Sequence, residues 1–304
     1  MDRATAPPAA PALGRPSADR PFVAIGYVLV AVAVFSVMDA MSKLLVAEYD
    51  PFEVVWGRYL AILFLLLPLV LRRPRNLVTT RPGLELARAI GVLGSALFFI
   101  AGLTRLPMAD ATAIGFASPL LVTALSIPLL GERVGPRRWS AVGAGFLGVL
   151  IVVRPGSGAF GVAAVLPLLS ASCWAVSLIV TRRMRGADSP LTMLLYSTVV
   201  GFVLSGAALP FVWRTPTLGA VTLMVLMGML SAGGQYLLIA GLTRSAASLL
   251  APFTYSQMVW STLMGVLVFG TVPTAWTWLG AAVIVGSGIY IAHRERVTSR
   301  AVAR

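Results

Sequence analysis

Four charged side chains lie inside the first two apolar runs of the chain. Asp39 and Lys43 occur in the first run and Glu53 and Arg58 in the second, so each acid lies about as far from the intervening turn as a base in the other run. If these runs cross a membrane, a lone charge near the centre costs about 2.5–3.5 kcal/mol. We therefore expect Asp39 to pair with Arg58 and Lys43 with Glu53, as an outer gate network. The alternative is that Lys43 and Arg58 reach outward as structural anchors.

Three further charged residues are expected to stabilise single helices. Arg88 lies three residues after Glu85, which predicts an ion pair on one helix face, and Asp110 lies in the first turn of the fourth span, where an acid is favoured.

A second group of hydroxyl, amide and aromatic side chains lies half-way along the apolar runs. Aromatic rings can stack on a flat ring or line an apolar slot, and hydroxyls and amides can bind the polar ends of a small molecule. Nearby residues weaken or interrupt the helices, which frees backbone groups for a ligand; they are Gly233, Gly234, Pro119 and Pro252. Each serine could instead bond to its own helix, and each aromatic could pack in the core or face lipid. The candidate substrate-binding residues are Ser95, Phe98, Phe116, Ser118, Trp174, Gln235, Tyr236, Tyr255 and Gln257.

Several kinds of chemistry are excluded by what the sequence contains. Its one cysteine, Cys173, and its one histidine, His293, cannot form a disulfide framework, a zinc site or a di-iron site. No nucleophile elbow, phosphate-binding loop or pair of carboxylates occurs in the short loops, so we expect no catalytic residues, no metal, no cofactor and no enzyme. The net charge of +13 comes from short basic clusters between apolar runs, which does not favour nucleic-acid binding.

The composition is that of a membrane protein. Of the 304 residues, 58% are hydrophobic and 12% are charged, and the mean hydropathy is +0.88. Average soluble proteins have roughly 25% charged residues, so a soluble globular enzyme is excluded. Backbone amides must be paired in hydrocarbon, and runs of this length predict an all-α fold with ten transmembrane helices. The expected spans are 22–47, 52–71, 84–104, 109–130, 136–153, 160–181, 190–212, 217–242, 246–269 and 274–292.

The basic residues predict how the chain is oriented. With an even number of spans, both termini and every second loop lie on one side, and most of the 24 Lys and Arg residues are there. The opposite loops contain only Arg105, Arg154 and Arg214. Because cytoplasmic loops are enriched in Lys and Arg, we expect both termini in the cytoplasm of a multi-pass plasma-membrane protein, typically a bacterial inner membrane.

The chain is an internal duplication. The segment Ile100–Arg105, IAGLTR, recurs unchanged as Ile239–Arg244, and this repeat offset, which pairs Ile100 with Ile239, aligns many other positions without a gap. We expect two five-helix domains, at 22–153 and 160–292, between a disordered cytoplasmic tail (1–21) and a second cytoplasmic tail (293–304). Five is odd, so the second unit is inverted relative to the first. Inverted repeats permit two related conformations around a midplane site, although a purely structural duplication is the alternative.

Three segments carry a family resemblance: FSVMDAMSKLL, PFEVVWGRYL and ADATAIGFASPLLVTALSIPLLGERVG. They resemble the EamA repeat of the drug/metabolite transporter superfamily, including aromatic amino acid exporters. The second half departs from the pattern, since Thr271 replaces Glu132 and Ser197 replaces Arg58. The resemblance implies ten helices, cytoplasmic termini and export of metabolites such as amino acids, with some relatives moving aromatic or cationic compounds.

The interpretation that accounts for most of these features is a secondary transporter working by alternating access. We expect it to export small amphipathic metabolites, above all amino acids with an aromatic or large apolar side chain. An exporter of organic cations is the close alternative, with Asp39 as the only buried acid suited to it, and a channel is a further one. A membrane enzyme acting on lipid lacks its acids or nucleophile. The expected partners are the substrate and the lipid bilayer, and the chain is a monomer or a homodimer.

Overall fold

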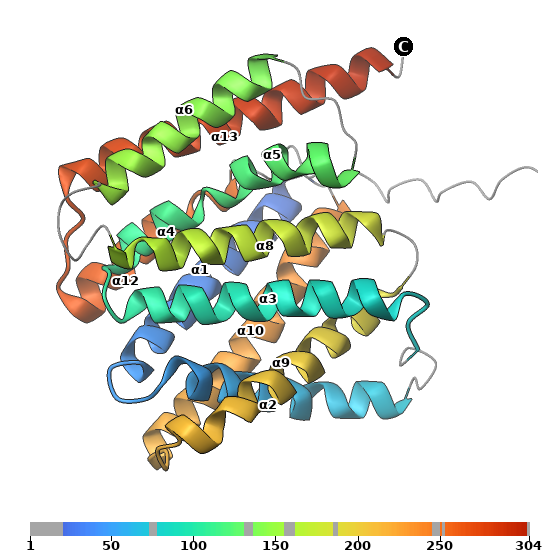
Figure 1. Cartoon of the computed structure of the whole chain (residues 1–304), viewed down its shortest axis with the longest axis vertical. Helices are drawn as coiled ribbons and strands as arrows, with labels where there is room; N and C mark the ends of the chain where they lie inside the picture. Colours follow the sequence, from blue (N-terminus) through green and yellow to red (C-terminus); the bar gives the residue numbers. More distant parts are fainter. Residues whose placement is uncertain are drawn as a thin grey trace, which may run out of the picture.

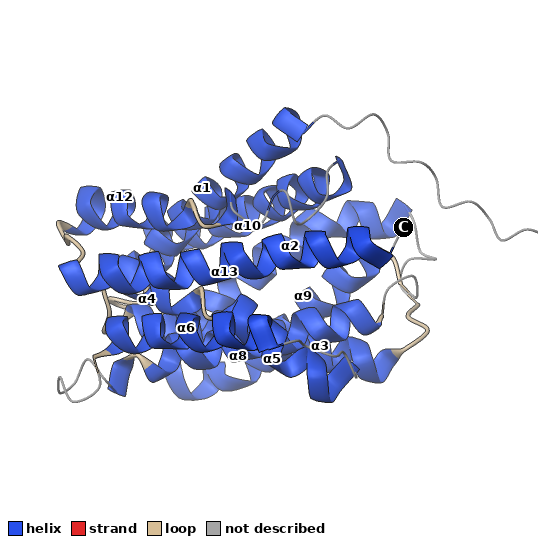
Figure 2. Ribbon diagram, turned by 90° about the horizontal axis from the view of Figure 1, so that it is seen from above, coloured by secondary structure: helices blue, strands red, loops and turns tan. Residues whose placement is uncertain are grey.

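The computed structural model describes residues 21–72, 78–130, 136–154, 162–184, 188–244, 250 and 253–302, and these ranges contain helices and no strand. The helices run side by side as a bundle (Figures 1 and 2). Their bounds are α1 Pro21–Leu45, α2 Pro51–Arg72, α3 Pro82–Leu103, α4 Met108–Gly115, α5 Ser118–Leu130, α6 Pro136–Val153, α8 Val165–Arg183, α9 Pro190–Val212, α10 Leu218–Arg244, α12 Gln257–Phe269 and α13 Ala275–Val302.

The helices are apolar on their outer as well as their inner faces. In the described part of the chain, six are long and apolar enough to cross a membrane, and four more are shorter but apolar. Large exposed side chains such as Phe64, Phe211 and Leu267 face outward, where lipid tails would cover them. The predicted all-α membrane fold is confirmed. The last helix, α13, continues to Val302, past the expected end of the tenth span.

Helix packing shows the inverted duplication directly. Under the repeat offset, α1, α2, α3 and α6 correspond to α8, α9, α10 and α13. The extensive contact of α3 with α8 has its counterpart in that of α10 with α1. The pairs α2–α9 and α6–α13 are their own counterparts, and they lie at opposite ends of the long axis (Figure 1). A two-fold axis that relates the repeats must map each of these pairs onto itself. The pseudo-two-fold axis therefore passes through both pairs, in the plane of the membrane.

The fourth expected span, 109–130, is not one continuous helix. It is divided into α4 and α5 by a turn at Phe116 and Ala117. Pro119 explains the interruption, because its ring nitrogen cannot donate a helical hydrogen bond and its ring disfavours helical geometry at the residue before it. The interruption that Pro119 predicted is therefore present, and it lies just before the proline, a position that the apolar run alone does not indicate.

The ninth expected span, 246–269, has an interruption at the corresponding place. Phe253 and Thr254 are helical, Tyr255 and Ser256 form a turn, and α12 begins at the next residue. Pro252, which the sequence analysis expected to weaken this span, lies outside the described residues. The repeat offset aligns this turn with the one in the first half. Each repeat therefore contains one interrupted helix, and the two interruptions lie at equivalent positions.

Glycines allow α6 and α13 to touch through their backbones. A Cβ atom added at Gly148 would lie 2.9 Å from the carbonyl oxygen of Gly280, and one added at Gly280 would lie 2.6 Å from that of Gly148. Small residues at such crossings favour association of helices in a membrane, where burial from water does not drive it. By contrast, Gly143 and Gly286 have no atom within 4 Å of an added Cβ, so they are not contact positions.

Cysteine labelling is expected to show the orientation of the bundle. In a Cys173→Ser background, Arg183→Cys should react only from the cytoplasm and Arg214→Cys only from outside, because these exposed residues lie at opposite ends of α9. Arg137→Cys should behave like the first variant. The measurement is labelling of whole cells with a membrane-impermeant maleimide, before and after permeabilisation. Labelling of both positions from the same side would contradict the predicted topology.

Candidate functional site

The two helix breaks contact each other through aromatic side chains. The ring of Phe116 lies edge-on to the ring of Tyr255, with 5.1 Å between the centroids and 66° between the planes. These residues are equivalent under the repeat offset, and two equivalent residues in contact must lie on the axis that relates the repeats. A pair of aromatic rings therefore lies on the pseudo-two-fold axis between the repeats.

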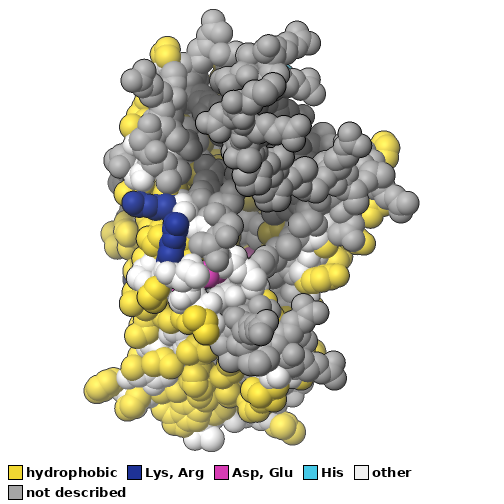
Figure 3. Space-filling view, turned by 90° about the vertical axis from the view of Figure 1, so that its right-hand side faces the viewer, with side chains coloured by type: hydrophobic (Ala, Val, Ile, Leu, Met, Phe, Trp, Pro, Cys, Tyr) yellow, Lys and Arg dark blue, Asp and Glu magenta, His cyan; other side chains and the backbone are white. Residues whose placement is uncertain are grey.

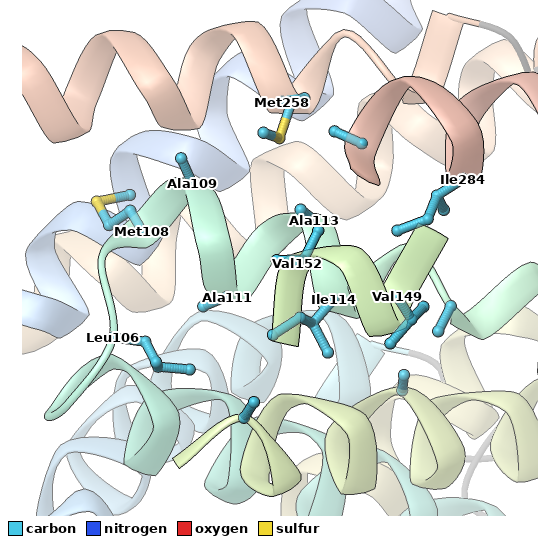
Figure 4. Close-up of a cluster of buried hydrophobic side chains, with 14 of the residues drawn as sticks. Leu106, Met108, Ala109, Ala111, Ala113, Ile114, Val149, Val152, Met258 and Ile284 are labelled. Atoms are coloured by element: carbon cyan, nitrogen blue, oxygen red, sulfur yellow. The ribbon is translucent and has the colours of Figure 1, made fainter. Parts of the chain in front are cut away.

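Small side chains position the first break. Every residue of α4 from Met108 to Ile114 is buried, and four of them are alanine or threonine, so neighbouring helices approach closely. Figure 4 shows α4 between Met258 of α12 on one side and Val152 and Ile284, of α6 and α13, on the other. The helix is embedded in the core, which keeps its C-terminal end at the axis.

Polar groups gather at the second break. The Gln257 side-chain amide, at the first residue of α12, donates to Oδ2 of Asp39 over 3.5 Å. The Ser36 hydroxyl reaches the backbone oxygen of Gln257 at 3.5 Å and that of Val32 at 3.0 Å. Ser256 provides no side-chain cap for α12, because its hydroxyl donates to the carbonyl of Phe253. The backbone amides of Met258 and Val259 at this helix start donate to the carbonyl oxygens of Tyr255 and Ser256.

Four of the candidate substrate-binding residues therefore come together at the breaks, namely Phe116, Ser118, Tyr255 and Gln257. Ser95 is used elsewhere, since its hydroxyl lies 3.2 Å from that of Ser170 in α8. The remaining interior candidates, Phe98, Trp174 and Gln235, are half-buried on α3, α8 and α10. Among the described residues, no ring–ring contact joins Trp174 to the central aromatic pair.

Tyr236 does not lie in the interior, contrary to expectation. Its side chain is 71% exposed on the outside of the bundle. Two residues along an α-helix is a rotation of about 200°. Because Gly234 packs against the ring of Phe35 in α1, Tyr236 points to the opposite side of α10. Position along the run was insufficient to decide this, since it indicates depth but not direction.

Asp39 and Arg58 are both buried, with 7% and 8% of their surface exposed. They do not form the expected direct ion pair, because no nitrogen of Arg58 lies within 4.0 Å of an Asp39 oxygen. Their charges interact over a longer distance. The Arg58 guanidinium instead lies over the ring of Tyr59, 5.2 Å from its centroid.

Lys43 and Glu53 are not paired either. The Lys43 ammonium donates to the carbonyl of Leu106 at 2.5 Å and lies 5.3 Å from the centre of the Phe269 ring. Glu53 accepts from the backbone amide of Arg214 at 3.3 Å. The prediction of this pair was wrong, because sequence distance from a turn sets the depth of two residues but not the faces of the helices that carry them.

Asp110 has a larger role than the sequence indicated. An acid in the first turn of a helix is an ordinary stabiliser, but Asp110 is buried and accepts a 2.5 Å hydrogen bond from Thr277, at the start of α13. Its charge also interacts with that of Lys43. This contact joins the two repeats at the end opposite the termini. Its only signal in the sequence was the position of Asp110 within the family-like segment.

Arg88 and Glu85 form the expected pair within α3, with 3.0 Å between Nε and Oε2. Arg88 also donates to Ser197 Oγ at 2.8 Å and to the backbone oxygen of Met193. The sequence predicted the pair but not the second function of Arg88, which is to join α3 to α9. Ser197 is the repeat equivalent of Arg58, so this contact has no symmetric counterpart.

The end of the bundle that carries the C-terminus has its own polar contacts. Thr79 donates to Oδ2 of Asp188 at 2.5 Å, and Arg81 donates to the backbone oxygen of Arg183 at 3.3 Å. These link the α2–α3 connection to the α8–α9 connection. In the view of this end, the described Lys and Arg side chains lie together near an acidic one, and most of the remaining described side chains are apolar (Figure 3).

Comparisons with known proteins agree on one family. Residues 22–154 and 161–292 each match the model of the EamA-like transporter family. The chain is 34% identical to a riboflavin transporter of Rhizobium johnstonii, over 71% of this chain and 72% of that protein. It is 29% identical to an S-adenosylmethionine uptake transporter of Rickettsia bellii, over 90% of this chain and 94% of that protein.

Two further similarities extend over nearly the whole chain. A pseudopaline exporter of Pseudomonas aeruginosa is 28% identical over 86% of this chain and 93% of its own length. One crystal structure superposes with a TM-score of 0.62 and 18% identity, covering 90% of this chain and 96% of the other. At that identity, the superposition shows that the fold is shared.

Proposed function

The chain belongs to the EamA-like transporter family, and from this premise we propose that it carries a small amphipathic, ring-bearing metabolite by alternating access. The observation that carries the proposal is the contact between Phe116 and Tyr255, where the broken helices of the two inverted repeats meet. Inverted repeats with interrupted helices at their interface form midplane sites that open to either side in turn. The aromatic pair and Gln257 offer such a site an apolar surface and a polar group.

The substrate class that we propose is wider than amino acids alone. Aromatic and large apolar amino acids suit a site with rings and amides, and they remain our first expectation. The named substrates of two relatives, riboflavin and S-adenosylmethionine, both combine a flat heteroaromatic ring with polar groups. The relatives include importers and an exporter. We propose export, with the direction set by the substrate gradient and by any coupled ion.

Transport of cationic compounds is the second candidate. It is favoured by Asp39, which is buried and contacts Gln257 beside the second helix break. A buried carboxylate next to aromatic rings is suited to an organic cation. The S-adenosylmethionine of one group of relatives is itself positively charged at sulfur. The two candidates differ in whether Asp39→Asn abolishes transport of cations only or of neutral substrates as well.

Placement in the membrane is part of the proposal. We propose a bacterial inner membrane, with both termini in the cytoplasm, for the reasons of charge distribution given above. The domain boundaries at 22–153 and 160–292 and the tails at 1–21 and 293–304 remain predictions, as does the choice between monomer and homodimer. We propose no enzymatic activity and no cofactor.

Counterflow in liposomes tests the proposed function. The purified protein is preloaded with phenylalanine, leucine, alanine, riboflavin, S-adenosylmethionine or tetraphenylphosphonium, and uptake of the labelled compound is followed with and without a pH gradient. We expect saturable uptake that is accelerated by substrate on the opposite side. Flux that shows neither saturation nor acceleration would indicate a channel, and absence of flux for every compound would contradict the proposal.

Single substitutions at the proposed site are expected to change selectivity. Tyr255→Ala and Trp174→Ala should weaken apparent binding of phenylalanine relative to alanine, by about 0.5–1.5 kcal/mol beyond the loss of area, because stacking is removed. Gln235→Ala should weaken both substrates equally if its amide meets a group common to amino acids. Tyr236→Ala is the matched control, since this tyrosine is exposed. If all variants fold with normal yield and keep the selectivity of the unmodified protein, these side chains do not form the substrate site.

A further inference from the structure

Two buried charges remain apart where direct pairing is expected. Asp39 on α1 and Arg58 on α2 are each more than nine-tenths buried, yet more than 4.0 Å separates their charged atoms. A charge within a membrane is costly, and two opposite charges at similar depth would lower that cost by direct contact. Both charges are therefore buried without a close ionic partner among the described residues.

The hydrogen bonds of these groups are incomplete on both sides. Gln257 is the one described side chain that hydrogen-bonds the carboxylate of Asp39, at 3.5 Å, which is the limit of such a contact. On the other side, Arg58 Nε is buried without a partner among the described residues, and the buried Tyr59 hydroxyl lies beside the Arg58 side chain, to which it cannot donate because a guanidinium has no acceptor. An unsatisfied buried donor costs about 1–3 kcal/mol, so these groups are suited to receive an acceptor.

Neighbouring charged groups do not compensate this pair. The nearby Arg88 is bound to Glu85 and Ser197. In the second repeat, the positions equivalent to Asp39 and Arg58 are Leu178 and Ser197. The separated charges therefore have no counterpart at the equivalent positions of the second repeat. If this pair were needed only to stabilise the α1–α2 hairpin, a similar pair would be expected in the equivalent α8–α9 hairpin.

We propose that Asp39 and Arg58 together bind the zwitterionic head group of an α-amino acid or of a larger metabolite that contains one. The substrate ammonium binds Asp39, and the substrate carboxylate binds the guanidinium of Arg58 and the hydroxyl of Tyr59. Gln257 joins this head-group site to the helix break, so the substrate ring extends toward Phe116 and Tyr255. The inference rests on the proposed transport function and narrows its substrate class, because riboflavin has neither an ammonium nor a carboxylate.

Three ligands that differ only in the head group test this site. Phenylalanine, phenylethylamine and 3-phenylpropionate compete with labelled phenylalanine for counterflow, and their binding to the purified protein is also measured by thermal shift. For the unmodified protein, we expect phenylalanine to bind at least about tenfold better than either of the other two. Equal binding of all three ligands, or no binding of phenylalanine, would overturn the inference.

Each substitution is expected to remove one half of this discrimination. With Arg58→Gln, phenylalanine should lose its advantage over phenylethylamine, whereas with Asp39→Asn it should lose its advantage over 3-phenylpropionate. Tyr59→Phe should have a smaller effect in the same direction as Arg58→Gln. Should Arg58→Gln fail to fold, Arg58→Lys retains the charge but not the bidentate geometry, and weaker carboxylate selectivity is expected.

Two outcomes would identify a different role for the pair. If both single variants lose every ligand equally and the Asp39→Asn/Arg58→Gln double variant recovers phenylalanine counterflow, the charges only stabilise the hairpin. If riboflavin shows saturable counterflow while amino acids do not, transport of a ring-bearing metabolite is supported and the head-group site is refuted. Failure of the site is thereby distinguished from failure of the proposed function, in which no compound is carried.

Discussion

Arg88→Met is expected to lower the free energy of unfolding by about 3–5 kcal/mol, because it leaves a buried carboxylate without its partner. Glu85 is 0% exposed, and one of its oxygens already has no hydrogen-bond partner among the described residues. The same substitution also removes the hydrogen bonds that join α3 to Ser197 and Met193 in α9. The measurement is unfolding of the purified protein in mixed micelles with increasing SDS.

A double variant separates the two contributions of Arg88. Neutralising both residues, as Glu85→Gln/Arg88→Met, should recover most of the lost stability, because the buried charge is removed along with its partner. Arg105→Met is the control, since this arginine is exposed in the connection between α3 and α4. Equal destabilisation by the single and double variants would show that the contacts to α9, and not the charge of Glu85, determine the stability.

Gly288→Ala is expected to destabilise the protein by about 1–3 kcal/mol and to reduce transport, because the new methyl group has no space. A Cβ atom at this position would overlap the Tyr255 hydroxyl oxygen and lie 2.7 Å from the carbon that bears it. Tyr255 would have to move, which would disturb its contact with Phe116 at the pseudo-two-fold axis. Thermal unfolding and counterflow by the same preparation measure the two effects.

The neighbouring glycine supplies the matched control. Gly286 lies on the same helix with no atom within 4 Å of an added Cβ, so Gly286→Ala should be close to neutral. Combining Gly288→Ala with Tyr255→Phe removes the nearest clashing atom and should restore part of the stability. Similar effects of the two alanine substitutions would mean that Tyr255 does not lie against α13 as described.

Features that depend on local composition or on linear repetition could be predicted from the sequence. Long apolar runs must be helical in hydrocarbon, because every backbone amide has to bond within its own segment. The recurrence of Ile100–Arg105 as Ile239–Arg244 revealed the duplication, and the odd number of helices in each unit implied inversion. The pair of Glu85 and Arg88 could also be predicted, since residues three apart on a helix face the same side.

The substrate could be predicted only as a class. The aromatic and amide residues favour a small amphipathic molecule, and this substrate class stays a prediction. Amino acids in particular are not singled out by the named substrates of the relatives. Our narrower proposal depends instead on the separation of Asp39 and Arg58, which is a distance between two helices and is therefore not written in either segment.

By itself, the sequence determined the helical membrane fold and the inverted duplication, because these follow from hydrophobicity and position along the chain. The tertiary structure decided the partners: Lys43 contacts Leu106 and not Glu53, and Tyr236 faces outward. It also placed Phe116 against Tyr255, on the axis between the repeats. Partner choice depends on the rotation and tilt of each helix against its neighbours, and packing among all the helices sets these together.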